Sequence, residues 1–399
     1  MQLNNNYKVV IVGGGSAGIS VAARLLRQSH SLFNQIAIVE PADKHYYQPL
    51  WTLVGGGAAK KEVTEREMQS VIPEGTIWIQ EAVNTFLPNE NAITTDQGTL
   101  ITYEYLVVAA GIEVNWNGVK GLQEALGQHE VCSNYSYTHV DYTWETIRSF
   151  KGGTALFTHP ATPVKCGGAP QKIMYLAEDY FNRSGVRNQT QVVFGSANPA
   201  IFDVAKYRAT LEKVLERKQI DARFRRNLIE INAEEKIATF EHLDTGAKET
   251  VAYDMIHVTP PMQAPTFIKN SPLSDAAGWL DVHKHTLQHN QFANVFGLGD
   301  CANLPTSKTG AAIRKQAPVA ATNIISLMRD QPLTASYDGY SSCPIVTGYN
   351  KLVLAEFDYT KEPCEMMPFN QAVERQSMYI LKKDLLPVMY WNGMLKGTM

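Results

Sequence analysis

The chain has 399 residues, of which 44% are hydrophobic and 19% charged, a balance typical of a folded protein with two or three modest cores. Its net charge of -3 and the lack of any Lys/Arg-rich run exclude a nucleic-acid-binding surface, because phosphate recognition needs clustered positive charge. No stretch reaches the roughly 18 uncharged apolar residues that a spanning helix needs, so any membrane contact is expected to be peripheral.

The five cysteines are widely spaced and show neither a CxxC pattern nor a Cys/His spacing suited to zinc. The sequence therefore predicts no metal site and no disulfide framework, and it directs attention to individual reactive thiols. A strand pattern at 7–12 leaves no room before it for a basic and then an apolar segment, so no cleavable targeting signal is expected.

A dinucleotide-binding unit is predicted at the start of the chain. The strand at 7–12 leads into GGGSAG at 13–18, a helical pattern follows at 19–28, and a second strand at 35–39 ends at Glu40. The first glycine of such a loop allows the tight turn, the second lets backbone approach a pyrophosphate, and the third lets helix pack on strand. A glycine-rich turn without a ligand is the alternative. The residues expected to hold the dinucleotide here are Gly13, Gly15, Ser16, Ala17, Gly18 and Glu40.

The remaining patterns predict an α/β fold with two Rossmann-like domains, the first of them discontinuous. After an insertion at 41–98, further first-domain elements are expected at 105–110, 294–299 and 311–328. Second-domain strands are expected at 154–158, 191–194, 222–224, 237–241 and 255–259, with helices at 170–182 and 205–218. The predicted boundaries are 1–150 with 270–335 for the first domain, 151–269 for the second, and 336–399 for a C-terminal region.

Two further motifs indicate which dinucleotide the first domain binds. VFGLGD at 295–300 resembles the second flavin motif of flavoproteins with two dinucleotide domains, whose aspartate binds the ribityl chain. VVAAG at 107–111 resembles their middle motif. The order of the three motifs favours FAD over NAD, and it adds Ala110, Gly111 and Asp300 to the expected cofactor residues.

The second domain lacks the glycine-rich loop that a nicotinamide dinucleotide needs. Its first strand runs into HPATP at 159–163, where prolines and side chains would obstruct a pyrophosphate. Cys166 follows in KCGGAPQK, just upstream of a helix that Pro170 is placed to begin, with Lys165 beside it; both features favour a thiolate. Cys343 lies in SSCP, a turn-like setting. Taken alone, either cysteine could instead be a small packing residue.

The stretches at 162–178, 257–262, 294–309 and 341–359 resemble the sulfide:quinone oxidoreductases, in particular their mitochondrial-like branch. The resemblance implies FAD, with Cys166 and Cys343 as a redox pair on one face of the flavin. Hydrosulfide would attack Cys343, which becomes a persulfide, while Cys166 leaves as a thiolate against the flavin. A sulfane-sulfur acceptor such as glutathione, sulfite, cyanide or polysulfide would then be needed. Cys132, Cys301 and Cys364 have no assigned role.

Further residues are expected beside the flavin and in a quinone-binding slot. Gln48 belongs to a loop that resembles the family's flavin-adjacent loop, while Lys308, Lys315 and Gln316 are expected to stabilise the charge of reduced flavin, unless they are ordinary surface residues. A quinone needs a flat apolar slot. The aromatic candidates for that slot are Tyr349, Phe357 and Tyr379, for which a core position is the alternative.

The segment 376–399 predicts two short amphipathic pieces that lie at a membrane surface or, as the alternative, pack on a partner subunit in a homo-oligomer. The expected location is peripheral, on a bacterial cytoplasmic membrane. Two other functions are kept open: an NADH:quinone oxidoreductase of the same architecture, and a flavin- or sulfur-binding sensor without turnover.

Overall fold

Strand β1 (Asn6–Val12) lies at the centre of the first sheet, as its run of β-branched residues predicted. The computed structural model describes residues 5–399. The first four residues, to which the prediction of no cleavable targeting signal also refers, lie outside the described residues. The first sheet has the order β5-β2-β1-β8-β7-β6, with β19 beside β8. Its other strands are β2 (Ile36–Val39), β5 (Thr76–Ile79), β6 (Val83–Leu87), β7 (Ala92–Thr95), β8 (Leu100–Val108) and β19 (Val295–Gly297).

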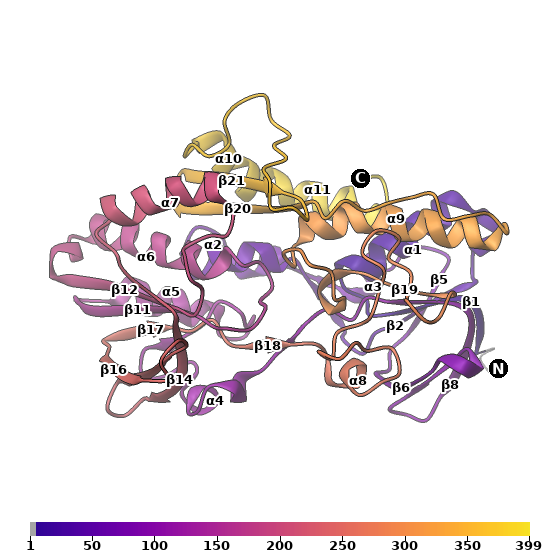
Figure 1. The fold of residues 1–399 in the computed structure, drawn as a ribbon, viewed down its shortest axis with the longest axis horizontal. Coiled ribbons are helices and arrows are strands. Elements are labelled where there is room, and N and C mark those ends of the chain that lie inside the picture. Colours follow the sequence, from indigo (N-terminus) through magenta and orange to yellow (C-terminus); the bar gives the residue numbers. More distant parts are fainter. Residues whose placement is uncertain (1–4) are drawn as a thin grey trace.

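Helices α1 (Ser16–Gln28) and α9 (Gly310–Met328) lie side by side on one face of this sheet (Figure 1). β1 pairs in parallel with both β2 and β8, so the dinucleotide loop between β1 and α1 sits at the carboxyl edge of three strands. Ligands bind at this edge in open α/β sheets. The segment predicted as an insertion at 41–98 contains an antiparallel strand pair and two short helices: β3 (Lys44–Tyr46), β4 (Glu65–Glu67), α2 (Trp51–Gly55) and α3 (Met68–Val71). The same segment also supplies β5, β6 and β7 to the first sheet, so it is only partly an insertion.

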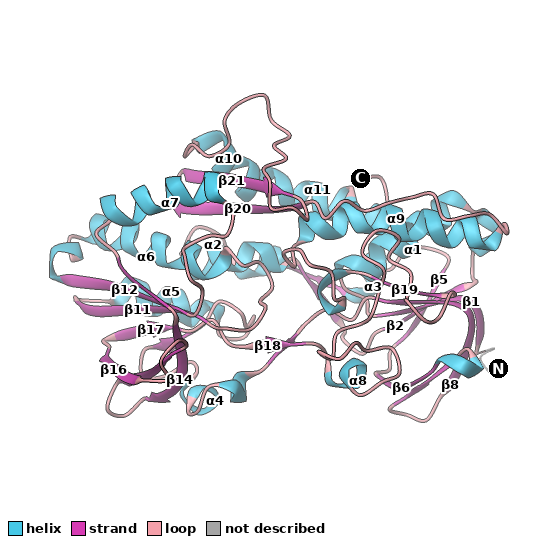
Figure 2. Cartoon of the chain, in the orientation of Figure 1, coloured by secondary structure: helices cyan, strands magenta, loops and turns pink. Residues whose placement is uncertain are grey.

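The second unit contains a parallel sheet of order β10-β17-β11-β12-β13. Helices α6 and α7 lie on one side of this sheet and a three-stranded meander lies on the other (Figure 2). The strands are β10 (Val131–Cys132), β11 (Gly153–His159), β12 (Thr190–Ser196), β13 (Asp221–Phe224) and β17 (Met255–His257), and the meander is β14 (Arg226–Asn232), β15 (Ile237–His242) and β16 (Lys248–Ala252). The helices are α4 (Leu122–Ala125), α5 (Val140–Ser149), α6 (Ala169–Ser184) and α7 (Ala205–Arg217). Helix α8 (Thr266–Lys269) packs on β6 of the first sheet, so the chain has already returned to the first unit before the predicted boundary at 270.

The change from the first unit to the second differs from the predicted boundary at 150. β10 pairs with β17, so the second sheet already includes Val131 and Cys132. Ile147 and Phe150 also belong to the hydrophobic core of the second unit. A two-residue strand is too short for a period-2 pattern, which explains why sequence periodicity placed the boundary too late. The chain passes from the first unit to the second through β9 (Glu113–Val114) and returns through β18 (Met262–Gln263). These two strands pair with each other in antiparallel fashion.

The C-terminal region covers both units. Its hairpin, β20 (Ser341–Gly348) and β21 (Lys351–Phe357), packs on α6 and α9. α10 (Gln376–Ile380) then continues through a π-helical turn, Leu381–Leu385, into α11 (Leu386–Asn392). The two pieces expected in 376–399 therefore form one nearly continuous helical run. Within residues 5–399, no helix combines the length and the apolar character required to cross a bilayer.

Gly18 fixes how closely α1 can approach β1. A Cβ atom at Gly18 would lie 1.9 Å from the carbonyl oxygen of Gly13. We expect Gly18→Ala to lower the free energy of unfolding by about 1–3 kcal/mol, because helix and strand must separate. Thermal unfolding followed by circular dichroism would measure the loss. Gly310→Ala is the matched control, since a Cβ there meets no atom within 4 Å; equal melting of both variants would contradict the prediction.

Candidate active site

A cavity of about 600 Å³ lies where the two units and the C-terminal region meet. Ten of the thirteen residues expected to hold the cofactor line it: Gly13, Gly15, Ser16, Ala17, Glu40, Gln48, Ala110, Gly111, Asp300 and Lys308. Cys166 lines the same cavity, so the expected cofactor residues and one of the two expected redox cysteines face a shared space.

The backbone of the dinucleotide loop faces the cavity, with free space beside it for a ligand. Gly13 has a φ of +104°, and a Cβ there would lie 2.5 Å from the carbonyl oxygen of Ala109, so only glycine fits the turn. A Cβ on Gly15 would meet no atom within 4 Å, because that residue faces the cavity. Glu40 accepts a hydrogen bond of 2.8 Å from the Gly14 N–H, which ties the end of β2 to the loop. These residues fit a bound dinucleotide pyrophosphate.

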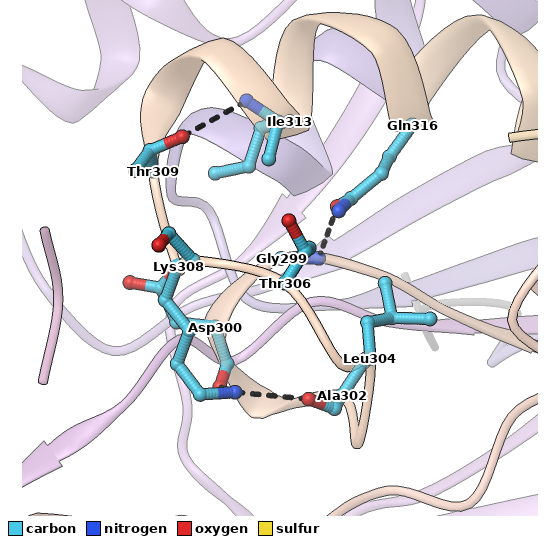
Figure 3. Close-up of a pocket in the computed structure, with 11 residues that line it drawn as sticks. Gly299, Asp300, Ala302, Leu304, Thr306, Lys308, Thr309, Ile313 and Gln316 are labelled. Carbon is cyan, nitrogen blue, oxygen red and sulfur yellow. Dashed lines mark hydrogen bonds between the residues drawn. The ribbon is translucent and has the colours of Figure 1, made fainter. Parts of the chain in front are cut away.

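The loop that follows β19 supplies a second polar wall (Figure 3). Asp300 is half-buried, its buried Oδ1 atom has no hydrogen-bond partner in the described residues, and desolvation raises the pKa of its carboxyl. A buried, unpartnered carboxylate oxygen aimed at the cavity is suited to a ligand hydroxyl. Lys308 instead donates to the backbone oxygens of Asp300 and Ala302, at 2.7 and 2.9 Å, and therefore holds the loop closed.

Cys166 and Cys343 are in contact. Each thiol is the strongest influence on the other's pKa, so the two side chains are neighbours although Cys166 lies just before α6 and Cys343 lies on β20. Cys166 has a left-handed backbone with φ of 59°, and its N–H donates to the Lys308 carbonyl oxygen at 2.8 Å. α6 begins at Ala169, one residue before the position expected from Pro170. The structure thus shows the pair as free thiols, with Cys166 on the cavity side and Cys343 fully buried behind it.

The two thiols have opposite proton affinities. The hydrogen bond from Cys343 and the ammonium group of Lys172 hold the pKa of Cys166 well below its usual value, despite burial. The same hydrogen bond, together with burial, raises the pKa of Cys343 well above its usual value. The two thiols therefore titrate as a pair, in which Cys166 loses its proton more readily than Cys343.

Two lysines that sequence reasoning missed surround the thiol pair. Lys172 is buried on α6 and its Nζ lies 3.1 Å from the Cys166 sulfur. Lys382 is buried in the C-terminal run and donates to the Pro49 carbonyl oxygen. Burial, reinforced by the charge of Lys172, lowers the pKa of Lys382 to about 7.

The expectation that Lys165 stabilises the thiolate needs a correction. Its Nζ lies 5.7 Å from the centre of the Trp51 ring, and it interacts with Asp300 rather than with the sulfur. Burial lowers the pKa of Lys165 to about 8. Lys172, six residues after the cysteine and one turn into α6, takes the position beside the thiolate, a relation that helical periodicity alone did not single out.

Several other expected residues lie outside the large cavity. Gln316 accepts a hydrogen bond of 2.9 Å from the Gly299 N–H (Figure 3), and the Lys315 ammonium lies 5.5 Å from the Tyr340 ring. Gly18 packs against Gly13 behind the loop. None of these three residues lines the large cavity. Gln316 and Gly18 instead contact Gly299 and Gly13, which do line it.

The three aromatic residues suggested for a quinone slot do not line the cavity either. Tyr349 donates to the Gly56 carbonyl oxygen and stacks under Arg183. Phe357 belongs to the second-unit core, and Tyr379 is buried in the core of the first. These aromatic residues are therefore packing residues, which was the alternative interpretation of their sequence pattern. The apolar part of the cavity comes instead from Leu354, Met366, Met367, Leu381, Leu386, Met389 and Met394.

The other three cysteines lie outside the cavity. Burial raises the pKa of Cys132 to about 12 and those of Cys301 and Cys364 to about 11. Cys301 packs beneath the Asp300 loop, 3.6 Å from the Val108 carbonyl oxygen. None of these thiols is positioned to exchange with the Cys166–Cys343 pair.

Comparison with known proteins places this site in a family. Residues 7–144 match the family model described as pyridine nucleotide-disulphide oxidoreductase. The chain is 48% identical to the mitochondrial sulfide:quinone oxidoreductase of Mus musculus, over 98% of this chain and 87% of the relative. It is 49% identical to the mitochondrial sulfide:quinone oxidoreductase of Dictyostelium discoideum, over 99% and 87%.

The fold also matches the crystal structure of the sulfide:quinone oxidoreductase from Aquifex aeolicus, with a TM-score of 0.85, 20% identity, and coverage of 98% of this chain and 92% of that one. Both curated relatives are named mitochondrial, so the expected bacterial cytoplasmic membrane finds no support. Identity near one half over almost the whole chain decides the family. The chain belongs to the sulfide:quinone oxidoreductases.

Proposed function

We propose that this enzyme oxidises sulfide at the Cys166–Cys343 pair, with FAD held in the adjoining cavity and a membrane quinone as the final electron acceptor. The observation that carries the proposal is the contact between the two thiols at the wall of the cavity that the dinucleotide loop also lines. When bound, FAD supplies the two-electron acceptor for the sulfur centre and the donor for the quinone.

The sulfur chemistry begins from the disulfide form of the pair. Hydrosulfide attacks the Cys343 sulfur, the S–S bond breaks, and Cys166 leaves as a thiolate while Cys343 keeps the added sulfur as a persulfide. A nucleophilic acceptor, such as glutathione, sulfite, cyanide or polysulfide, then takes the outer sulfur and leaves Cys343 as a thiolate. Re-formation of the disulfide releases two electrons, which balances the oxidation of sulfide to the sulfane level.

The residues around the pair suit Cys166 as the leaving group. A thiolate leaves more readily when its conjugate thiol has a low pKa. The neighbouring Cys343, together with the Lys172 ammonium 3.1 Å from the sulfur, lowers the pKa of Cys166. Lys382 adds a second group whose charge can change near neutral pH. Cys343, whose pKa is raised, keeps a proton more firmly and suits the role of sulfur carrier.

The second unit supports sulfide rather than NADH as the electron source. Its first strand, β11, ends at His159, and the residues that follow are Pro160 and Ala161 instead of a glycine-rich turn. Asn198 lies 3.3 Å from the His159 ring, so side chains occupy the position where a nicotinamide dinucleotide would need exposed backbone N–H groups. The chain keeps the fold of this domain without its ligand loop.

The C-terminal helical run supports contact with a membrane surface. Four apolar side chains on it are exposed by 38–54%: Ile380, Leu385, Val388 and Met389. Met389 also lines the cavity, so this apolar surface and the cavity share a wall. A quinone dissolved in lipid would reach the cavity most directly from this side.

Replacing either cysteine should abolish turnover. Cys166→Ser and Cys343→Ser should each lower sulfide-dependent quinone reduction by at least about 100-fold, because a hydroxyl can neither form nor reopen the sulfur bridge. Flavin absorbance after addition of sulfide or NADH would measure the first half of the reaction. Cys364→Ser, outside the cavity, is the control. Full activity of either site variant, or bleaching by NADH alone, would overturn the proposal.

Removing the Lys172 charge should raise the pKa of the Cys166 thiol. In Lys172→Met we expect the midpoint of the pH profile for iodoacetamide alkylation of reduced enzyme to rise by about one to three pH units. Reactivity below neutral pH is then lost first, because a raised pKa protonates the thiolate there. Lys172→Arg should restore the native profile. An unchanged profile in the methionine variant would show that Lys172 does not stabilise the thiolate.

Charges on the exposed apolar face should weaken membrane contact. We expect Leu385→Asp combined with Val388→Asp to lower co-sedimentation with phosphatidylcholine vesicles by about tenfold or more, since both side chains lose apolar burial. The matched control is Val63→Asp with Leu100→Asp, because these apolar residues are exposed to a similar degree, by 57% and 51%, on the first unit. Equal loss in both double variants would rule out a specific surface.

A further inference from the structure

Tyr390 of α11 reaches from the C-terminal run into the dinucleotide loop. Its side chain is buried, and its hydroxyl oxygen lies 2.7 Å from the Ser16 hydroxyl oxygen and within hydrogen-bonding distance of His45 Nε2. His45 Nδ1 lies 3.0 Å from the Gly14 carbonyl oxygen. One tyrosine therefore connects two adjoining parts of the loop, although it is more than 370 residues away in sequence from Ser16.

The directions of these hydrogen bonds are fixed by their partners. The Gly14 carbonyl can only accept, so His45 Nδ1 carries the proton and donates. Burial lowers the pKa of His45 to about 4, so the ring is neutral and its Nε2 accepts from the Tyr390 hydroxyl. Tyr390 has then used its one proton, and Ser16 must donate to it. The chain runs from Ser16 through Tyr390 and His45 to the Gly14 carbonyl oxygen.

The rest of the C-terminal segment is packed to hold Tyr390 in place. Tyr47 lies against Tyr390 with ring centres 4.5 Å apart, and the guanidinium of Arg66 lies 4.3 Å above the Trp391 ring. The final residues run along α1, where a Cβ on Gly397 would lie 2.9 Å from the Ala23 backbone (Figure 1). The segment is thus attached to α1 both at the dinucleotide loop and beyond it.

The same segment forms part of the cavity wall. Met389, Tyr390, Met394 and Met399 line the cavity together with Gly14 and Gly15. A dinucleotide in the loop would therefore be covered by these residues, and its escape would require them to move. The Ser16 hydroxyl, whose proton is donated to Tyr390, is left to accept from a ligand rather than to donate to it.

We propose that residues 386–399 form a clasp that retains the cofactor, with Tyr390 as the positioning residue that docks it. This inference rests on the proposed function, in which FAD occupies the loop. Docking fixes the Gly14 carbonyl and the Ser16 side chain in the conformation that the loop has when it faces the cavity. Coupling between two binding events is reciprocal, so bound FAD also stabilises the docked clasp.

The test compares the release of FAD from native enzyme and from Tyr390→Phe. Loaded enzyme is diluted, and the rise in fluorescence of free FAD gives the dissociation rate. We expect release to be about tenfold faster or more in the variant, because His45 loses its donor and Ser16 its acceptor inside a buried site. Tyr253→Phe is the matched control, since its hydroxyl is also buried but has no hydrogen-bond partner in the described residues.

A second measurement follows the clasp itself. Limited proteolysis within 386–399 should be slowed by FAD in native enzyme and much less so in Tyr390→Phe, an effect that general loss of stability would not produce. Should Tyr390→Phe fail to fold, Gly397→Val carries the test, because it loosens the clasp at a residue that does not line the cavity.

The outcomes separate the two proposals. Native-like release of FAD, or protection of the clasp by FAD that is unaffected in the variants, overturns the clasp while leaving the proposed function intact. Native enzyme that binds no FAD at all overturns the proposed function instead.

Discussion

The contact between the Cys166 and Cys343 sulfurs is the constraint on which the rest of the site depends. The two residues meet because α6 of the second unit packs against β20 of the C-terminal hairpin. Cys166 adopts a left-handed backbone, which costs about 1–3 kcal/mol for a residue other than glycine. Its N–H is bound by the Lys308 carbonyl oxygen from the first unit. All three parts of the molecule thus converge on one strained residue, and its sulfur faces the cavity for that reason.

Burial of a thiol raises its pKa, and the two nearby lysines oppose this effect at Cys166. Burial favours the protonated form of a thiol, whereas the neighbouring Cys343 and the Lys172 ammonium together lower the pKa of Cys166. Burial, reinforced by the nearby charge of Lys172, lowers the pKa of Lys382 to about 7. The site therefore places Lys172 beside the Cys166 sulfur and adds Lys382, whose pKa lies near neutrality.

Local pattern predicted the elements that position this site, and contacts between distant residues decided the rest. β1, α1 and β2 follow from a strand, a glycine loop and a helix that are adjacent in sequence, and α9 follows from its long apolar run. The sheet pairing of β10, only two residues long, was not predictable, because it depends on β17 far along the chain. Lys382 and Tyr390 were missed for the same reason, since no residue near them in sequence marks them as neighbours of the cysteines or of the loop. Lys172 is only six residues from Cys166, but spacing alone did not show that its side chain turns back toward the sulfur.

The C-terminal run carries Lys382 and Tyr390 on one nearly continuous helix, eight residues apart, so both are placed by a single docking event. Lys382 reaches the thiol pair and Tyr390 reaches the dinucleotide loop, while Leu385 and Val388 between them are exposed. Side chains that alternate in this way bury one helical face against the cavity and present the other to the surroundings. In the proposed function, the sulfur chemistry, the retention of the cofactor and the approach of a lipid-soluble acceptor all depend on the packing of this segment. Loss of that packing would therefore disturb all three together, whereas changes confined to its exposed face would disturb only the last.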